Sequence, residues 1–86
     1  MKELEQILKA LANKRRLTIL KLLKSRGEAS VGQIADGIRL SFKATSKHLN
    51  ILARADLLEK DQRSLIVFYS LNDTQKLFVK LLIKDL

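Results

Sequence analysis

The sequence predicts an α+β fold that is mainly helical and contains one β-hairpin, in the order helix, helix, helix, helix, strand, strand, helix. Leucine and isoleucine recur at the three- and four-residue spacing of a helix face both before and after residues 65–71. Those residues, LIVFYSL, are β-branched and aromatic, as is typical of a strand. A chain of 86 residues has room for one hydrophobic core. We therefore expect a single domain over residues 1–86.

The first two helices are predicted from leucine spacing. The first, over residues 2–12, has an apolar stripe at i, i+3, i+4 and i+7: Leu4, Ile7, Leu8 and Leu11. Asn13 is a suitable N-cap for the second helix, which carries Leu17, Leu20 and Leu23 and should end near Gly27.

Two serines predict where the next helices begin. Ser30 with Gln33 forms a capping box, so a short third helix should run from there toward Gly37. Ser41 can cap a fourth helix over residues 41–54. Its core-facing stripe is Thr45, Leu49 and Leu52.

The remaining chain predicts a hairpin and a last helix. Residues 57–60 could pair with 65–71 across a polar turn from Asp61 to Ser64. Asn72 is expected to cap the final helix. That helix has Leu77, Phe78, Leu81 and Leu82 on one side.

The positive charge is concentrated in two stretches. The formal net charge is +8, and residues 13–26 contain six basic residues and no acidic one. Residues 39–54 contain four more, again with no acid. Two such stretches on one surface would attract a polyanion.

The fourth helix has a polar and basic side opposite its core stripe, formed by Lys43, Ser46, Lys47, Asn50 and Arg54. The major groove of B-DNA admits one α-helix, whose outward side chains must be able to hydrogen-bond to base edges. A short helix, a tight connection, such a helix and then a hairpin is the order of a winged helix-turn-helix. The sequence therefore predicts sequence-specific binding of double-stranded DNA.

Three stretches resemble the ArsR-type winged-helix repressors. LANKRRLTILKLL at 11–23 is similar to the second helix of that family, VGQIADGIRLSFKATSKHLNILARADLL at 31–58 to its helix-turn-helix, and LEKDQRSLIVFYSL at 58–71 to its wing. The most diagnostic part is the run 46–49, SKHL, followed by Leu52 and the pair Leu57 and Leu58. The resemblance implies a recognition helix at 41–54 in the major groove, a wing at 58–71 on the flanking DNA, and a dimer built by the terminal helices.

The expected DNA-binding site lies on the fourth helix and the residues next to it. The residues expected to read bases are Phe42, Lys43, Ser46 and Lys47, and those expected to contact the DNA backbone are Ser41, Asn50, Arg54, Arg63 and Arg39. The terminal helices, residues 1–12 and 72–86, have more apolar surface than so small a core requires. We therefore expect a homodimer, with an interface of Leu4, Ile7, Leu8, Leu11, Leu77, Phe78, Leu81 and Leu82. Its two-fold symmetry would require a pseudo-palindromic operator.

The chain departs from the family at several positions. Phe42 replaces a common polar residue and could contact a thymine methyl group or pack. Arg39, Asp56 and Ser64 stand where glycine is common, so these turns must reach positive φ without glycine or adopt another shape. The family's metal ligands are also missing, because the chain has no cysteine and one histidine. We expect no metal and no cofactor.

Other residues have competing interpretations. His48 borders the core stripe, where a structural role is favoured over a catalytic or sensing one. Phe68 and Tyr69 alternate along a strand, so one should pack inward. The basic run 14–16 could contact phosphates or form a solvated turn at a helix start.

Several classes of function are disfavoured. The chain has no phosphate loop, cysteine nucleophile or paired histidines, which argues against an enzyme. No apolar run is long enough to cross a membrane and no signal peptide is evident, so we expect a cytoplasmic protein. The sequence identifies no effector. We expect a transcriptional regulator that acts as a repressor. Two alternatives stay open: a protein-interaction module that docks through Phe42, Leu65 or the terminal helices, and nucleic-acid binding without sequence preference.

Overall fold

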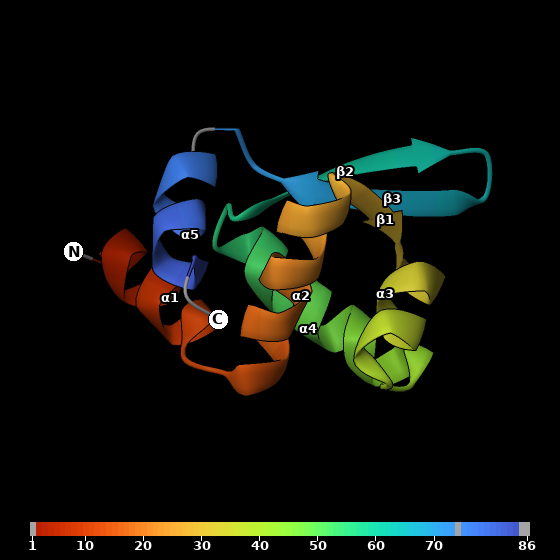
Figure 1. The fold of residues 1–86 in the computed structure, drawn as a ribbon, viewed down its shortest axis with the longest axis horizontal. Coiled ribbons are helices and arrows are strands. Elements are labelled where there is room, and N and C mark those ends of the chain that lie inside the picture. Colours follow the sequence, from red (N-terminus) through yellow and green to blue (C-terminus); the bar gives the residue numbers. More distant parts are fainter. Residues whose placement is uncertain (1, 74, 85–86) are drawn as a thin grey trace.

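A computed structural model describes residues 2–73 and 75–84 of the chain. Within these residues the elements are α1 (Lys2–Leu11), α2 (Lys14–Arg26), β1 (Glu28–Ser30), α3 (Val31–Ile38), α4 (Phe42–Arg54), β2 (Leu58–Arg63), β3 (Ile66–Leu71) and α5 (Lys76–Ile83). The predicted mainly helical α+β fold is confirmed. The hairpin of β2 and β3 extends beyond the helices at one end, and α1 and α5 lie at the other end (Figure 1).

The starts of α2, α3 and α4 predicted from capping residues are confirmed. The Asn13 side chain accepts a hydrogen bond from the Arg16 amide at 3.1 Å and caps α2. Ser30 and Gln33 form the complete capping box of α3, with both reciprocal hydrogen bonds present. Each signal depends only on residues within one turn, which is why the sequence alone is sufficient to find them.

One strand was not predicted. β1 pairs antiparallel with β3, which gives a three-stranded sheet in the order β1, β3, β2. Three residues, Glu-Ala-Ser, show no alternation that could predict a strand, and only the partner strand far along the chain fixes them as one. The sheet therefore joins the end of α2 to the hairpin.

The hairpin turn is shorter than predicted and begins three residues later, at Ser64, because the strands pair as far as Arg63 opposite Ile66. The turn therefore consists of Ser64 and Leu65, and the segment 61–63 that was expected to be part of it belongs to β2.

The predicted cap of the last helix is wrong. Asn72 does not start the helix, because its backbone amide donates to the Leu57 carbonyl at 3.0 Å and stays tied to the strand ends. A turn follows, in which the Gln75 amide donates to the Asn72 carbonyl, and α5 starts only at Lys76.

In the described part of the chain, three non-glycine residues adopt positive φ, as the first of the two alternatives predicted: Arg39 at 56°, Asp56 at 59° and Ser64 at 59°. Arg39 ends α3, and the Leu40 amide returns to the Ala35 carbonyl. Asp56 follows α4 in the same way, with the Leu57 amide on the Leu52 carbonyl. Both helix ends are thus Schellman motifs made without glycine.

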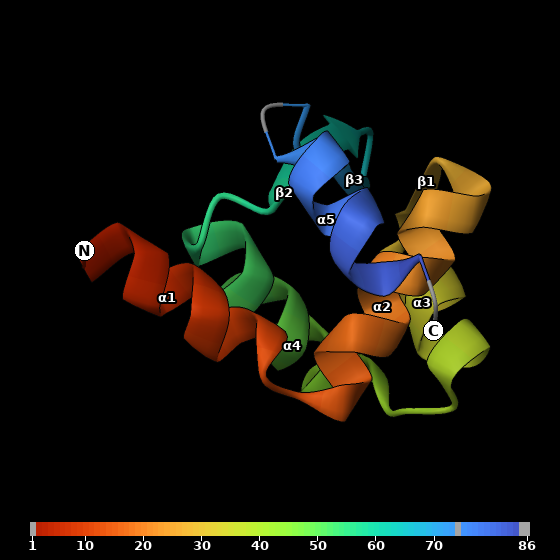
Figure 2. The ribbon, with the colours of Figure 1, turned by 60° about the vertical axis from the view of Figure 1, so that its left-hand side comes forward.

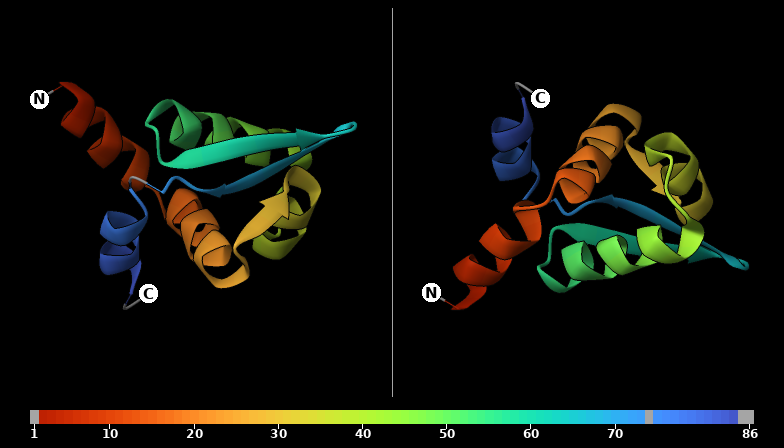
Figure 3. Two further views of the ribbon diagram at one scale, coloured as in Figure 1. Left: turned by 90° about the horizontal axis from the view of Figure 1, so that it is seen from above. Right: turned by 90° about the horizontal axis from the view of Figure 1, so that it is seen from below.

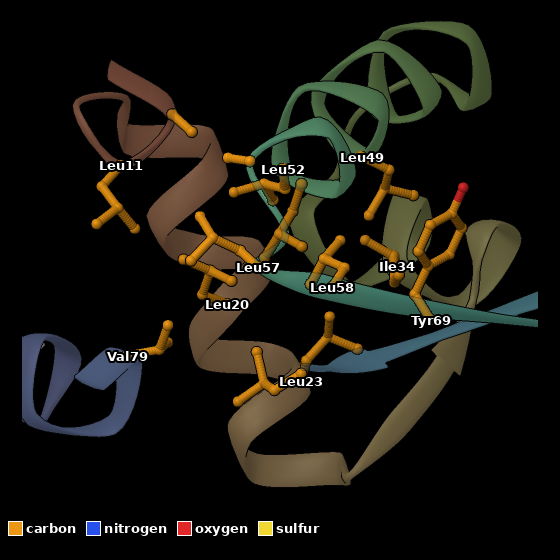
Figure 4. Close-up of a cluster of buried hydrophobic side chains, with 14 of the residues drawn as sticks. Leu11, Leu20, Leu23, Ile34, Leu49, Leu52, Leu57, Leu58, Tyr69 and Val79 are labelled. Atoms are coloured by element: carbon orange, nitrogen blue, oxygen red, sulfur yellow. The ribbon is translucent and has the colours of Figure 1, made fainter. Parts of the chain in front are cut away.

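The core lies between α2, α4 and the inner face of the sheet. The buried side chains of α2 (Leu20, Leu23), α4 (Leu49, Leu52) and β3 (Tyr69) belong to one cluster between these elements (Figure 4). Tyr69 is thus the inward-facing member of the Phe68 and Tyr69 pair, as alternation predicted. Val79 and Ile83 of α5 are also fully or almost fully buried. They fix α5 against α2 and leave the rest of that helix outside.

Candidate nucleic-acid interface

The helix α4 is held by its inner face and its start. Thr45, Leu49 and Leu52 are completely buried, as their spacing predicted. The Ser41 hydroxyl accepts a hydrogen bond from the Ala44 amide at 3.1 Å and caps the first turn. This hydroxyl is therefore engaged within the protein. Figure 3 shows α4 on the opposite side of the molecule from α2 and α5, so its outer face is free of other elements.

The outer face of α4 carries the residues that the sequence predicted for DNA. Lys43, Lys47, Asn50 and Arg54 are exposed. They follow one another at i, i+4, i+7 and i+11, so they form one stripe that extends for about 16 Å along the helix. Ser46 is only half-exposed. Among the described residues of α4 there is no acidic side chain, so the stripe is uniformly polar or cationic.

The register of the hairpin assigns its side chains to two faces. Leu58, Lys60 and Gln62 point to the face of buried Tyr69, and Glu59, Asp61 and Arg63 point to the opposite, outer face. Lys60 is exposed, and its amine lies 5.9 Å from the centre of the Tyr69 ring. A surface hollow beside it is also lined by Asn50 and Arg54 of α4.

Lys60 thus continues the basic stripe of α4 onto the hairpin, and it was not among the residues predicted from the sequence. The signal that could have found it is the period of two from Leu58, once the turn is placed at Ser64 and Leu65.

Arg63, which was expected on the DNA backbone, is engaged on the outer face. Its guanidinium donates to both carboxylate oxygens of Glu28 at 2.8 and 2.7 Å and to Asp61 at 2.8 Å. It also lies 4.5 Å from the centre of the Phe68 ring. The hydrogen bond from Arg63 lowers the pKa of Glu28, and those carboxylates raise the pKa of Arg63. The charge of Arg63 is therefore balanced within the sheet.

Two further arginines hold helix ends. Arg15 donates to the Ile38 carbonyl at 3.4 Å, at the end of α3. Arg16 donates to the carbonyls of Lys9 and Ala10 in the last turn of α1. Cations are favourable at these ends because the carbonyl groups there lack helical partners. Within the run 14–16 the structure thus gives Arg15 and Arg16 structural partners, while Lys14 is exposed. Arg39 is exposed at the end of α3.

His48 has a structural environment. Its Nδ1 lies 3.3 Å from a guanidinium nitrogen of Arg16. Arginine can only donate, so this ring nitrogen accepts and the ring is neutral with its proton on Nε2. Partial burial lowers the pKa of His48, and the charges of Arg16 and Arg15 lower it further.

Phe42 lies at the start of α4 with 62% of its surface exposed. It borders a surface hollow of about 340 Å³ together with Ser30, Val31, Gly32, Leu65, Ile66 and Val67. The hairpin tip contributes Leu65, which is 93% exposed. An apolar surface thus adjoins the polar stripe.

The residues expected at a dimer interface divide into two groups. Leu4, Leu8, Leu77, Phe78, Leu81 and Leu82 are all exposed, on the two helices at the end opposite the hairpin tip. Leu11 is instead 7% exposed in the core of the same chain, and Ile7 packs partly against that core. Of the segments 1–12 and 72–86, residues 1, 74, 85 and 86 lie outside the described part. Figure 2 shows α1 and α5 diverging, with the N-terminal end of α1 farthest from the rest.

In the described part of the chain, no group of three or more His, Cys, Asp or Glu side chains could hold a metal ion. None of the helices of residues 2–73 and 75–84 has the length and apolar character to span a bilayer.

Comparison with known proteins gives consistent matches. Residues 13–60 match the model of the bacterial regulatory protein, arsR family. The chain is 42% identical to the transcriptional activator HlyU of Vibrio cholerae over 77 residues, which cover 88% of this chain and 70% of HlyU. It is 35% identical to the transcriptional repressor SdpR of Bacillus subtilis, with 83% of this chain and 78% of SdpR covered.

Two solved structures are similar to this chain in fold. Reduced HlyU from Vibrio cholerae superimposes with a TM-score of 0.85 at 38% identity, covering 96% of this chain and 87% of that one. A homodimeric winged helix-turn-helix DNA-binding domain from Mycobacterium bovis, solved by NMR, gives a TM-score of 0.87 at 29% identity, covering 96% of this chain and 76% of that one.

Proposed function

The chain belongs to the ArsR family of bacterial regulatory proteins, and we propose that it acts as a homodimer that binds a pseudo-palindromic operator in double-stranded DNA and represses transcription. It is a winged helix-turn-helix transcriptional regulator and not an enzyme. The observation that carries the proposal is the exposed stripe of Lys43, Lys47, Asn50 and Arg54, on a helix whose opposite side is buried. We expect this binding to take place in the cytoplasm.

The stripe has the chemistry of a groove reader. Lys43 and Lys47 can donate to guanine O6 and N7, and the methyl group of a thymine can contact Phe42. Ser46 is half-exposed and is proposed as a further contact to a base edge in the groove. Asn50, Arg54 and Lys60 lie farther along α4 and on β2, where the DNA backbone would pass. Ser41 and Arg39 are proposed as backbone contacts at the start of the helix.

The homodimer is supported by the two terminal helices. Val79 and Ile83 bind α5 to its own core, so the exposed Leu77, Leu81 and Leu82 are left for another partner. Leu4 and Leu8 supply a similar exposed surface on α1. The winged-helix domain from Mycobacterium bovis is a homodimer. A two-fold axis through these helices would place the recognition helices of the pair about 34 Å apart, one turn of DNA.

Repression is proposed because a dimer bound over a promoter excludes polymerase. The relatives include both signs of regulation, since SdpR is a repressor and HlyU an activator. A promoter fused to a reporter and carrying the selected operator measures the sign directly, and a rise in expression on adding the regulator would refute repression.

The test of DNA binding is a selection of duplexes from a random pool at two salt concentrations, followed by affinity measurements. We expect a symmetrical motif with a steep salt dependence. Replacing both Lys43 and Lys47 by alanine should weaken operator binding at least about 100-fold, since each base or phosphate contact contributes about 1–3 kcal/mol. The matched control is the pair Lys21→Ala and Lys24→Ala on the exposed side of α2, which removes equal charge and should weaken binding far less.

Circular dichroism and sedimentation must show that both double variants keep the fold and the dimer. Retained operator affinity in the α4 variant would refute the assignment of this face. Equal affinity for scrambled duplexes would indicate binding without sequence preference.

The hollow between Phe42 and Leu65 favours a second candidate function, which is docking of an apolar protein segment. Such a module would bind no duplex tightly and would show no steep salt dependence. The same selection experiment therefore decides between the two functions.

A further inference from the structure

A single side chain of α2 joins the first helix to the recognition helix. The Arg16 guanidinium donates to the carbonyls of Lys9 and Ala10, in the last turn of α1, and to Nδ1 of His48 on α4. Its own backbone amide is fixed by the Asn13 cap at the start of α2. Three helices thus meet at one planar, five-donor group whose geometry matches acceptors in fixed directions.

We propose that Arg16 and His48 form a joint that positions α4 relative to α1, and that protonation of His48 opens this joint and weakens operator binding. The inference rests on the proposed homodimeric DNA binding, in which α1 belongs to the interface and α4 reads the groove. A dimer presents its two recognition helices at the spacing of one DNA turn only if each helix is fixed relative to the interface.

The chemistry of the joint depends on the charge of the ring. Neutral His48 accepts a hydrogen bond from the Arg16 guanidinium through Nδ1. Protonated His48 carries a hydrogen on both ring nitrogens and can no longer accept, and it places a second positive charge against the guanidinium. Arg16 must then leave either the ring or the carbonyls of α1.

The surroundings of His48 offer its charged form no compensation. From α2 the ring experiences the positive charges of Arg16 and Arg15. From α1 come the carbonyls bound by Arg16 and the amine of Lys9, which forms an ion pair with Glu5 at 3.0 Å. On α4 itself Arg54 borders the neighbouring hollow with Lys9 and Arg16. The elements α3 and β2 also pack against α4. Among the described residues, no carboxylate of these elements shifts the pKa of His48.

The sign of the effect follows from the direction of the pKa shift. Burial and the two arginines lower the pKa of His48 from its ordinary value of 6.5. The joint is therefore complete above that value, and it opens as the pH falls below 6.5 through the lowered pKa. Ordinary electrostatics predicts the opposite trend, because a protein that gains positive charge binds DNA more tightly.

The test compares operator affinity at pH 7.5 and at the acidic pH at which an NMR titration shows the His48 ring to be protonated, at constant ionic strength. The wild-type protein should lose about fivefold or more in affinity, a typical coupling between two sites. His48→Gln keeps an acceptor but cannot titrate, so its affinity should be the same at both pH values. The Arg16→Gln variant should bind the operator weakly at both pH values. Lys21→Gln removes one charge from the exposed side of α2 and should keep the wild-type pH dependence.

The titration of His48 itself provides the second measurement. Because the chain has one histidine, its ring signal in an NMR titration is unambiguous. If protonation weakens DNA binding, linkage requires that bound operator lowers the pKa of His48 further. A pKa raised by bound DNA, or unchanged or tighter operator binding at low pH, would overturn the proposal.

A third measurement does not depend on DNA. The protection factors of the amides in the last turn of α1 should fall as His48 becomes protonated in the wild-type protein. They should not change in this way in His48→Gln. If the selection finds no operator, the proposed function fails while this measurement still decides the joint. Exchange in α1 that is indifferent to the protonation of His48 would refute it.

Discussion

Replacing Lys60 by glutamine should reduce both the operator affinity of the dimer and the salt dependence of that affinity. Lys60 lies on the hairpin face that turns toward α4, beside Asn50 and Arg54. It is exposed, and no carboxylate is on its side of the hairpin, since Glu59 and Asp61 point to the opposite face. A phosphate beside α4 would therefore meet an unneutralised amine.

The expected change in the salt dependence follows from the two Lys60 side chains that a dimer presents to DNA. Each phosphate neutralised on B-DNA contributes about 0.9 to the slope of log K against log salt, so two Lys60 side chains contribute about 1.8. A fourfold increase in salt then changes the affinity ratio of wild type to variant by about 12-fold. The variant should thus be most impaired at low salt. Fluorescence anisotropy of a labelled operator at five salt concentrations measures both the loss and the slope.

The control for Lys60→Gln is a change at Arg63, a basic residue on the opposite face of the hairpin. Arg63 is held by Glu28 and Asp61, so the variant Glu28→Gln with Arg63→Gln keeps the net charge and should keep the wild-type slope. The assignment of the two hairpin faces would be refuted if this pair lowered the salt slope as much as Lys60→Gln. In that case the guanidinium would leave its carboxylates for a phosphate.

Substitutions at three positions test the energetics of the fold. Thr45 is buried and its hydroxyl has no hydrogen-bond partner, so Thr45→Val should raise the free energy of unfolding by up to about 1 kcal/mol in a urea titration. A decrease of similar size in the free energy of unfolding would show that the hydroxyl has a hydrogen-bond partner. Ser64 has a φ of 59° at the hairpin tip, and Ser64→Gly should stabilise the protein by about 0.5–1 kcal/mol, whereas Ser64→Val should destabilise it. Equal stability of the two variants would argue against a strained turn. The pKa of Glu28 lies below its ordinary value of 4.5, so the stability that its bond to Arg63 contributes is present above 4.5 and is lost as the pH falls further. Glu28→Gln should therefore show a weaker pH dependence of unfolding in this acidic range, and an unchanged dependence would mean that the Glu28–Arg63 pair does not persist in solution.

The helices could be predicted from the sequence because their signals are local. Asn13, Ser30 and Ser41 each accept from an amide three residues later, and such a bond is visible in the order of the residues. The buried stripe of α4 follows likewise from the helical period. The positive φ of Arg39 could be expected from the ArsR resemblance, because glycine is common at that position.

The parts that were not predicted depend on residues distant in sequence. β1 exists because it pairs with β3, about forty residues away along the chain. The start of α5 is delayed because the Asn72 amide is bonded to the Leu57 carbonyl. Leu11 follows the same stripe as Leu4 and Leu8, yet it is buried because α2 and α4 converge on the end of α1. Periodicity identifies an apolar face, and only the tertiary contacts decide which part of it stays free.

The same distinction applies to charge. A formal charge of +8 predicts a polyanionic partner without saying where it binds. Arg15, Arg16 and Arg63 are occupied by carbonyls, a ring nitrogen and carboxylates within the fold. The outer face of the sheet, with Glu28, Glu59 and Asp61, would repel DNA. Exposed cations remain along α4, at Lys60 of the hairpin, and at Lys21 and Lys24 of α2. Because Lys60 and the end of α4 border one hollow and form a continuous basic surface, we expect a duplex to approach from that side, with α4 in the groove and Lys60 beside the backbone.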